Sequence, residues 1–465
     1  MSFDALMDDA SGEIGGALRA GRDFLSTTPT RELLANVGRT IEAVPAACYP
    51  DKRWFQRSFG RSVTDAPDDL LVGGGLFYLT EQRRLFLDCT AGHYQMTWGY
   101  DHPELSELLR DAVARGIVWD NHSNLPAAPV KRLASKLIEL ANRGGANSDL
   151  QRDGRRLNTA LLGIATGSVA CAAALKIMLT HYAKAKREKG PPVFISLEGN
   201  YHGADFLAQR LRGMWPEYFA HLEVATIRPN DAEELEQAFG RYGERVAGFW
   251  AEPIMMNCEA LVLDSPYLRL ARSLCDRGGA LMALDEIQTG FWFPEVLYSR
   301  RRGVEPDLLV LGKGMTAGFH PLSALVYRGR FDCLEQYDAI STNGNAALAA
   351  YLGLGCIALI EREAAAIERA GAHYQRRMSE LVDEFPDLLV EARGEGHMTG
   401  LKFARVEDAL GFHRCAVERG LWIRAHAYHA GHSTVLTKFA LPLQAEVADF
   451  AVEAMRDLLA RRPWQ

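Results

Sequence analysis

The feature that most constrains the fold is an alternation of short apolar runs with helical patterns across residues 91–345. The apolar runs have the length of strands, and the Ala-rich segment 168–189 between the first two has the length of a helix. Strands that alternate with helices predict an α/β fold with a mostly parallel sheet covered on both faces. The expected strands are 160–164, 193–197, 224–227, 246–250, 280–284 and 308–311.

The two ends of the chain lack this alternation. A chain of 465 residues suits two or three structural units. We expect an N-terminal arm with part of a small domain at 1–90, a large domain at 91–345, and a C-terminal small domain of α+β type at 346–465. The small-domain elements are expected to be strands at 76–79, 85–87, 401–403 and 435–439, a helix at 346–360 that an amphipathic segment extends to 385, and a helix at 445–461.

The composition indicates a protein that folds in water and binds small molecules. Hydrophobic residues make up 48% and charged residues 24% of the chain, as in average globular proteins. Lys and Arg number 52 against 59 Asp and Glu, and this net charge of −7 without long runs of one sign argues against a nucleic-acid partner. The apolar stretch 346–360 is shorter than the roughly 20 residues that span a membrane, so no membrane partner is expected.

The eight cysteines are scattered singly along the chain. No C-x-x-C pair and no His spacing suited to zinc accompanies them, so we expect free thiols and no metal site. The first residues lack the basic region and apolar core of a secretory signal. Both observations favour a cytoplasmic protein.

Three features follow the predicted strands, at the edge where open α/β sheets bind ligands. Small residues at 166–170 open the Ala-rich helix, whose first amides could hold a phosphate. Asp285 ends a strand that we expect to be buried, where a carboxylate needs a cation. Lys313 follows another such strand, where an apolar environment would make it a nucleophile. Each feature alone also has a plain structural explanation, as a helix cap, an ion pair or an exposed loop charge.

Together the three features match the requirements of one cofactor. Pyridoxal 5′-phosphate needs an anchor for its phosphate, a lysine for its aldehyde, and an acid opposite its ring nitrogen. The combination on one sheet edge is more specific than any of its parts. It predicts a pyridoxal-phosphate site at this edge.

The same segments resemble a known family. The sequence ALDEIQTGF at 283–291, followed by Pro306-Asp307 and by LGKGM at 311–315, is similar to the signature of class III (ω-type, subgroup II) aminotransferases. Further similar motifs extend from about residue 76 to the end of the chain. The resemblance implies fold type I, with a mostly parallel seven-stranded sheet in the large domain, and homodimers whose active sites lie at the subunit interface.

The resemblance implies a role for each matching residue. Lys313 is similar to the Schiff-base lysine that also moves the proton during catalysis, and Asp285 to the acid opposite the ring nitrogen. Glu252 resembles a supporting acid, and a purely structural role at its strand end stays open. The cofactor contacts implied are Gly167, Ser168 and the Val169 amide at the phosphate, Tyr201 stacked on the ring with His202 beside it, and Gln288 at the 3-oxygen.

A phosphate contact from the second subunit is also implied. Both Ser341 and Thr342 resemble the family threonine that makes it: spacing favours Ser341, and residue type favours Thr342.

Several positions depart from the family pattern, and they bear on the substrate. Lys438 and Asn257 stand where members that act on α-amino acids often have an arginine and a glutamate. Because a lysine cannot grip a carboxylate with two parallel donors, Arg424 is considered as a substitute. Tyr94 and Trp98 are candidates for the pocket wall, or for packing alone.

We therefore predict an aminotransferase that moves an amino group from an amine or amino acid donor to a 2-oxo acid or aldehyde through Lys313. The alternative is a same-fold enzyme that needs no external acceptor: an aminomutase, racemase, decarboxylase or phospholyase. A non-catalytic scaffold or nucleotide-binding protein with the same sheet is a further alternative. The sequence does not identify the donor or the acceptor.

Overall fold

The computed structural model describes residues 14–47, 69–117, 125–143, 156–218, 221–335, 338–339, 341, 344, 346–427 and 429–465. The chain forms two compact units. The large unit comprises Tyr94–Thr97 and Glu104–Ala366, and the small unit comprises the segments Met1–His93, Trp98–Pro103 and Ile367–Gln465. The last boundary between the two units falls between Ala366 and Ile367, inside one helix. The predicted division into three segments stays a prediction.

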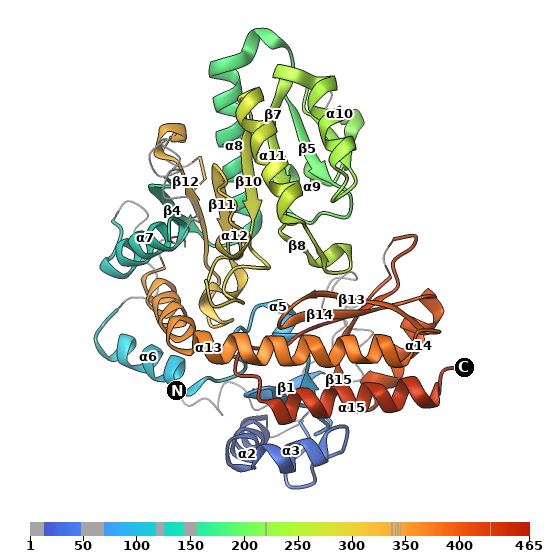
Figure 1. The fold of residues 1–465 in the computed structure, drawn as a ribbon. Coiled ribbons are helices and arrows are strands. Elements are labelled where there is room, and N and C mark those ends of the chain that lie inside the picture. Colours follow the sequence, from blue (N-terminus) through green and yellow to red (C-terminus); the bar gives the residue numbers. More distant parts are fainter. Residues whose placement is uncertain are drawn as a thin grey trace. The chain divides into compact units, whose positions relative to one another are not determined.

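A seven-stranded sheet forms the centre of the large unit (Figure 1). Its strand order is β4-β12-β11-β10-β7-β5-β6, and β12 alone runs antiparallel to its neighbours. The expected mostly parallel seven-stranded sheet is thus confirmed. The strands are β4 (Thr159–Ile164), β5 (Val193–Leu197), β6 (Glu223–Ile227), β7 (Val246–Ala251), β10 (Leu281–Asp285), β11 (Leu308–Leu311) and β12 (Ser323–Tyr327).

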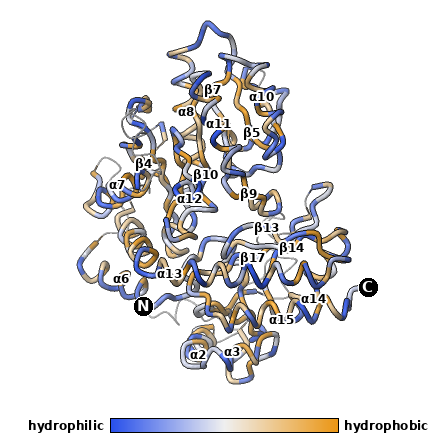
Figure 2. Tube along the Cα trace, viewed as in Figure 1, coloured by the Kyte–Doolittle hydropathy of each residue, from blue (hydrophilic) through white to orange (hydrophobic). Residues whose placement is uncertain are grey.

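Helices cover both faces of this sheet because its strands are apolar on both sides. Helix α8 (Gly167–Lys186) packs on one face, where its buried alanines share a core with Leu281 and Ala283 of β10. Helix α11 (Ser265–Gly278) contacts β7 and β10, and Tyr267 meets Phe249 on the opposite face. Figure 2 shows the central strands β5, β7 and β10 mostly in the hydrophobic colour. Two-sided burial of this kind is typical of parallel sheets.

The six strands predicted in the middle of the chain are confirmed within one residue at each end. Strand β12 was not predicted. It returns antiparallel to β11 without an intervening long helix, so the alternation of strands and helices does not reveal it. Further helices of the large unit are α6 (Pro103–Ala114), α7 (Ala128–Ala141), α9 (Phe206–Leu211), α10 (Ala232–Tyr242) and α12 (Tyr298–Arg302).

The small unit contains two four-stranded sheets, in the orders β1-β2-β3-β15 and β13-β14-β17-β16. The predicted N-terminal arm contains two helices, α2 (Ile14–Thr27) and α3 (Thr30–Asn36), which the sequence analysis did not predict. Helix α2 buries Ile14, Ala17, Gly21 and Leu25, a helical spacing that is visible in the sequence. The strands are β1 (Leu70–Gly74), β2 (Phe77–Thr80), β3 (Leu85–Asp88), β13 (Leu389–Glu395), β14 (Met398–Phe403), β15 (Leu421–Trp422), β16 (Arg424–His426) and β17 (Thr434–Lys438).

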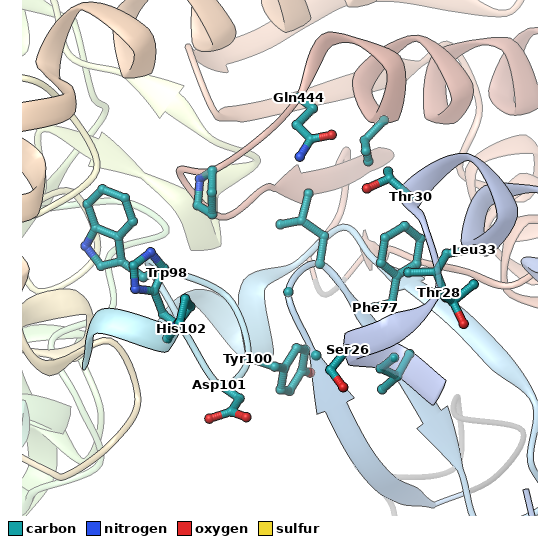
Figure 3. Close-up of a pocket in the computed structure, with 17 residues that line it drawn as sticks. Ser26, Thr28, Thr30, Leu33, Phe77, Trp98, Tyr100, Asp101, His102 and Gln444 are labelled. Atoms are coloured by element: carbon teal, nitrogen blue, oxygen red, sulfur yellow. The ribbon is translucent and has the colours of Figure 1, made fainter. Parts of the chain in front are cut away.

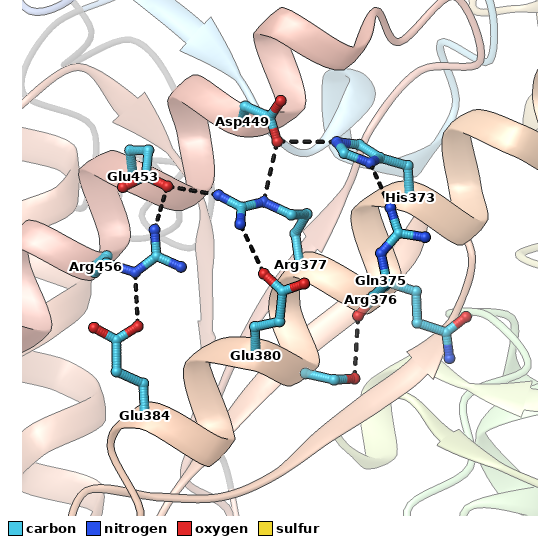
Figure 4. A network of polar contacts seen from close by, with 10 residues as sticks. His373, Gln375, Arg376, Arg377, Glu380, Glu384, Asp449, Glu453 and Arg456 are labelled. Carbon is cyan, nitrogen blue, oxygen red and sulfur yellow. Dashed lines mark hydrogen bonds and ion pairs between the residues drawn. The ribbon is translucent and has the colours of Figure 1, made fainter.

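Helix α13 (Ala347–Glu384) is continuous over 38 residues and spans both the apolar helix predicted at 346–360 and the amphipathic segment predicted to extend it to 385. Its glycines permit close packing: a Cβ on Gly355 would lie 2.6 Å from Leu108 Cδ1 of α6. In the small unit, α13 is tied to the closing helix α15 (Ala445–Arg461) by a network of ion pairs (Figure 4). Among the described residues, no helix has the length and apolar character needed to cross a membrane.

Candidate active site

Asp285 and Lys313 lie at the same edge of the large sheet. Asp285 ends β10, which runs parallel to β11 with Asp285 opposite Val310. Lys313 comes two residues after the end of β11 and begins a short 3₁₀ turn. Its φ of 42° lies in the left-handed region that residues other than glycine rarely adopt. Such backbone strain is often found at functional sites.

The neighbouring carboxylates of Asp285 and Glu286 have different tasks. Side chains alternate between the faces of a strand, so the two carboxylates leave the strand end in different directions. Glu286 is buried and accepts hydrogen bonds from the backbone N–H groups of Tyr298 (2.6 Å) and Ser299 (2.7 Å) at the start of α12. It therefore stabilises a helix end, and Asp285 remains as the candidate site carboxylate.

Three donors of the chain hold the Asp285 carboxylate. The backbone N–H of Ile287 donates to Oδ1 at 2.9 Å. His202 Nδ1 lies 2.8 Å from Oδ2, and the Cys171 thiol of α8 donates to the same oxygen at 3.5 Å. All four residues are buried. The hydrogen bond to Asp285 and its charge, working against burial, raise the pKa of His202 above its ordinary value.

Glu252 follows β7 and joins two of the predicted cofactor contacts. Its Oε1 accepts a hydrogen bond from the Tyr201 N–H at 2.7 Å, and its Oε2 accepts one from Gln288 Nε2 at 3.2 Å. Burial, reinforced by the charge of Asp285 and opposed by that of His202, raises the pKa of Glu252 to about 7. Its carboxylate therefore changes charge near neutral pH.

Burial lowers the pKa of Lys313, and the carboxylates of Glu252 and Asp285 oppose this effect. The lowered pKa increases the fraction of neutral amine at Nζ, which is the nucleophilic form. The charges of Glu252 and Asp285 therefore both act on the Lys313 amine.

The N-terminus of α8 lies beside the turn that carries Lys313. A Cβ on Gly167 would lie 2.6 Å from Ile287 Cδ1, and one on Gly312 would lie 3.6 Å from Ile287 Cγ1. Ile287 thus packs between the two glycines. The first amides of a helix have no intrahelical acceptor, and the Thr166 side chain makes no capping hydrogen bond to them. The amides of residues 167–169 can therefore receive an anion at the positive end of a 20-residue helix.

The hydroxyls of the two serines predicted near the phosphate already have partners within the chain. Ser168 Oγ accepts a hydrogen bond from the Ala204 N–H at 3.0 Å. Ser341 Oγ accepts one from the Ala165 N–H at 3.2 Å. Thr342 lies outside the described residues.

Two predicted substrate residues belong to the large unit. The segment that carries Tyr94 is tied to the Lys313 turn, because Thr97 Oγ1 donates to the Gly314 carbonyl at 3.1 Å. Asn257 lies half-buried on the short 3₁₀ turn Met256–Cys258, a few residues after Glu252.

Three predicted substrate residues, Trp98, Arg424 and Lys438, belong to the small unit. Trp98 is buried at the wall of a cavity of about 410 Å³ within that unit (Figure 3). Arg424 Nη1 lies 3.2 Å from His93 Nδ1. Lys438 is fully buried in β17.

Cys171 is the residue that the sequence analysis missed. It follows Gly167 by one helical turn, so it lies on the same face of α8 as Gly167. That spacing could have indicated it. Cys171 Sγ, His202 Nδ1 and Asp285 Oδ2 lie within 4.8 Å of one another. In the structure these atoms are joined by hydrogen bonds, and the expected absence of a metal site stays a prediction.

Comparisons with known proteins place the chain in a family. The family model of class-III aminotransferases matches residues 72–459. The chain is 25% identical over 410 residues to the mitochondrial ornithine aminotransferase of Oryza sativa subsp. japonica, covering 84% of this chain and 80% of the relative. It is 28% identical over 364 residues to the acetylornithine aminotransferase of Xylella fastidiosa (strain 9a5c), covering 76% and 84% of the two chains.

A solved structure shows the same fold. The transaminase from the marine bacterium Virgibacillus has a TM-score of 0.75 at 18% identity, covering 89% of this chain and 96% of that one. The family match spans most of the chain, from the first strand of the small unit into its last helix. The chain belongs to the class-III aminotransferases, the pyridoxal-phosphate-dependent transaminases of fold type I, which act on small amines and carbonyl compounds.

Proposed function

We propose that Lys313 is the catalytic lysine of this aminotransferase, which moves an amino group from an amine or amino acid donor to a 2-oxo acid or aldehyde. The observation that carries the proposal is the group of half-buried Lys313 and buried Asp285 and Glu252 at one sheet edge, beside the N-terminus of α8. The cofactor requires three groups: an amine, a carboxylate, and an anion-binding site such as the N-terminus of α8.

The residues present fit pyridoxal 5′-phosphate. The close approach of Gly167 to Ile287 leaves no room for a side chain at the start of α8, so backbone amides face the anion seat. The amides of Gly167, Ser168 and Val169 would hold the phosphate, Tyr201 and His202 would lie against the ring, and Gln288 would meet the 3-oxygen. When bound, the cofactor supplies an electron sink for the bonds at the substrate Cα.

Lys313 and Asp285 supply the acid–base groups. Because its pKa is lowered, Lys313 Nζ can accept the proton that leaves the substrate Cα and hold it for the return step. Asp285, held by three hydrogen bonds within the chain, would face the ring nitrogen of the cofactor. Glu252 orients the Tyr201 backbone and the Gln288 amide together.

For the donor, we propose a compound with a primary amine at the end of an unbranched chain. The two curated relatives are named for ornithine and acetylornithine, which share that group. Tyr94, Trp98, Asn257, Arg424 and Lys438 stay our candidates for contacts with the rest of the substrate. Ser341 or Thr342 stays the candidate for a phosphate contact from a second subunit, within a homodimer.

We also propose a reducing compartment, the cytoplasm, for this enzyme. All seven cysteines in the described residues are free thiols, and four of them are buried. Free thiols are the usual state in a reducing compartment.

The dependence on an amino acceptor tests the proposed reaction. Holoenzyme is incubated with ornithine or N-acetylornithine, alone and with 2-oxoglutarate or pyruvate, and glutamate or alanine is quantified. We expect amino acid product only when donor and acceptor are both present, and none from Lys313→Ala. Continued turnover of the amine without any acceptor would instead favour an aminomutase or a related enzyme.

A further inference from the structure

We propose that Cys171 is a positioning residue for Asp285, whose thiol hydrogen bond keeps the shared proton on the cofactor ring nitrogen rather than on the carboxylate. This inference rests on the proposed function, in which Asp285 faces that nitrogen. The Cys171 thiol donates to Asp285 Oδ2 at 3.5 Å, and both side chains are buried.

The position of the thiol is fixed by the fold. Cys171 lies in the second turn of α8, on the side of the helix that packs against β10 and its neighbours. Asp285 is the last residue of β10, and it lies within hydrogen-bonding distance of Cys171. A thiol is a weak donor and a weak acceptor, and next to a carboxylate it acts as the donor. Burial first, and then the charge of Asp285, raises the pKa of Cys171 well above its ordinary value, so the proton stays on sulfur.

The hydrogen-bond inventory of Asp285 shows what the thiol adds. An ionised carboxylate offers about four acceptor positions. The chain fills one at Oδ1 through the Ile287 N–H and two at Oδ2 through His202 and Cys171. Among the residues that the structure describes, no donor fills the remaining position, at Oδ1. The thiol therefore completes Oδ2 and directs the remaining lone pair of the carboxylate to a donor at Oδ1.

The same bond affects basicity. Each hydrogen bond donated to a carboxylate stabilises its charged form and lowers its affinity for a proton. Removal of one donor makes Asp285 a stronger base, so a proton shared with the ring nitrogen moves toward the carboxylate.

The test is nitrogen-15 NMR of holoenzyme loaded with pyridoxal phosphate labelled at the ring nitrogen, because that resonance reports ring protonation directly. For Cys171→Ala and Cys171→Val we expect the ratio of protonated to unprotonated nitrogen to fall about two- to tenfold, the range that one net hydrogen bond supports. Cys171→Ser keeps a donor and should stay nearer to the wild type.

Two further variants make the result decisive. Cys356→Ala removes an equally buried thiol from α13, and we expect the wild-type resonance. Asp285→Asn removes the charge and should shift the nitrogen to its unprotonated form. Val fills the space of the thiol but has no donor. If Cys171→Ala does not fold, the resonance of Cys171→Val therefore gives the result.

Failure of this inference is distinguishable from failure of the proposed function. A wild-type resonance in Cys171→Val, with a large shift in Asp285→Asn, would overturn the role of Cys171 alone. An equal shift in the Ser, Ala and Val variants would also overturn it, since packing would then be the cause. An unshifted resonance in Asp285→Asn would instead contradict the assignment of Asp285.

Discussion

Single buried groups at the sheet edge set the chemistry of this protein. Glu252 illustrates this, because it is a carboxylate that the fold buries beside Asp285 while using both of its oxygens as acceptors. A buried acid of this kind favours its neutral form until a cation or a donor compensates it. Its protonation is therefore coupled to the charges of Lys313 and His202 around it.

Glu252 gives a pH prediction for the cofactor-free protein. Its pKa rises from 4.5 to about 7 on folding, so between these values the folded state binds more protons than the unfolded state. Its contribution to the free energy of unfolding therefore falls as the pH rises through this window and is constant above it. Urea unfolding of the wild type and of Glu252→Gln should show a difference that changes across the window. Parallel pH profiles for the two proteins would contradict this.

The placement of Asp285 and Lys313 at one sheet edge could be predicted from the sequence because each lies at or just after the end of an apolar strand, and strand ends are fixed by local pattern. The contacts around them could not. The bond between Cys171 and Asp285 joins residues 114 positions apart and depends on how α8 is rotated against the sheet. The bridge from Glu252 to the Tyr201 backbone likewise depends on the packing of two loops.

At the scale of elements, one helix, α13, contains both the predicted apolar helix and the amphipathic segment that follows it. Its glycines at 353 and 355 allow α7 and α6 to pack closely against the helix there. Strand β12 was missed because its place in the sheet is set by pairing with β4 and β11, which are distant or antiparallel partners.

The contact between α13 and α15 gives a stability prediction. Arg377 of α13 pairs with Glu380 of the same helix and with Asp449 and Glu453 of α15, at 2.5–3.0 Å, with its side chain only 20% exposed (Figure 4). A partly buried arginine with three partners is worth more than an isolated surface pair. We expect Arg377→Ala to lower the free energy of unfolding by about 1–2 kcal/mol, and less at high salt.

The control is Arg110→Ala, because Arg110 makes one exposed pair with Glu107. Thermal or urea unfolding of both variants at low and high salt measures the difference. Equal effects of the two substitutions would show that the network between α13 and α15 adds nothing beyond a surface pair.

At the scale of the whole molecule, we expect two copies of the chain to form the active enzyme. The resemblance to the family implies sites completed by a partner, and a phosphate contact from residue 341 or 342 would come from it. Sedimentation velocity should therefore give a mass of about twice 51.5 kDa. A monomer that is active at the assay concentration would contradict the shared site.

The central claim, that Lys313 binds the cofactor, is tested most directly by borohydride reduction of the holoenzyme followed by peptide mass spectrometry. Reduction fixes the cofactor to the lysine that binds it. Lys186→Ala is the matched control, because Lys186 is another lysine whose pKa is lowered by burial. We predict the pyridoxyl mass on the Lys313 peptide in the wild type and in Lys186→Ala, and its loss in Lys313→Ala; a label on another lysine, or no label on the wild type, would contradict the account.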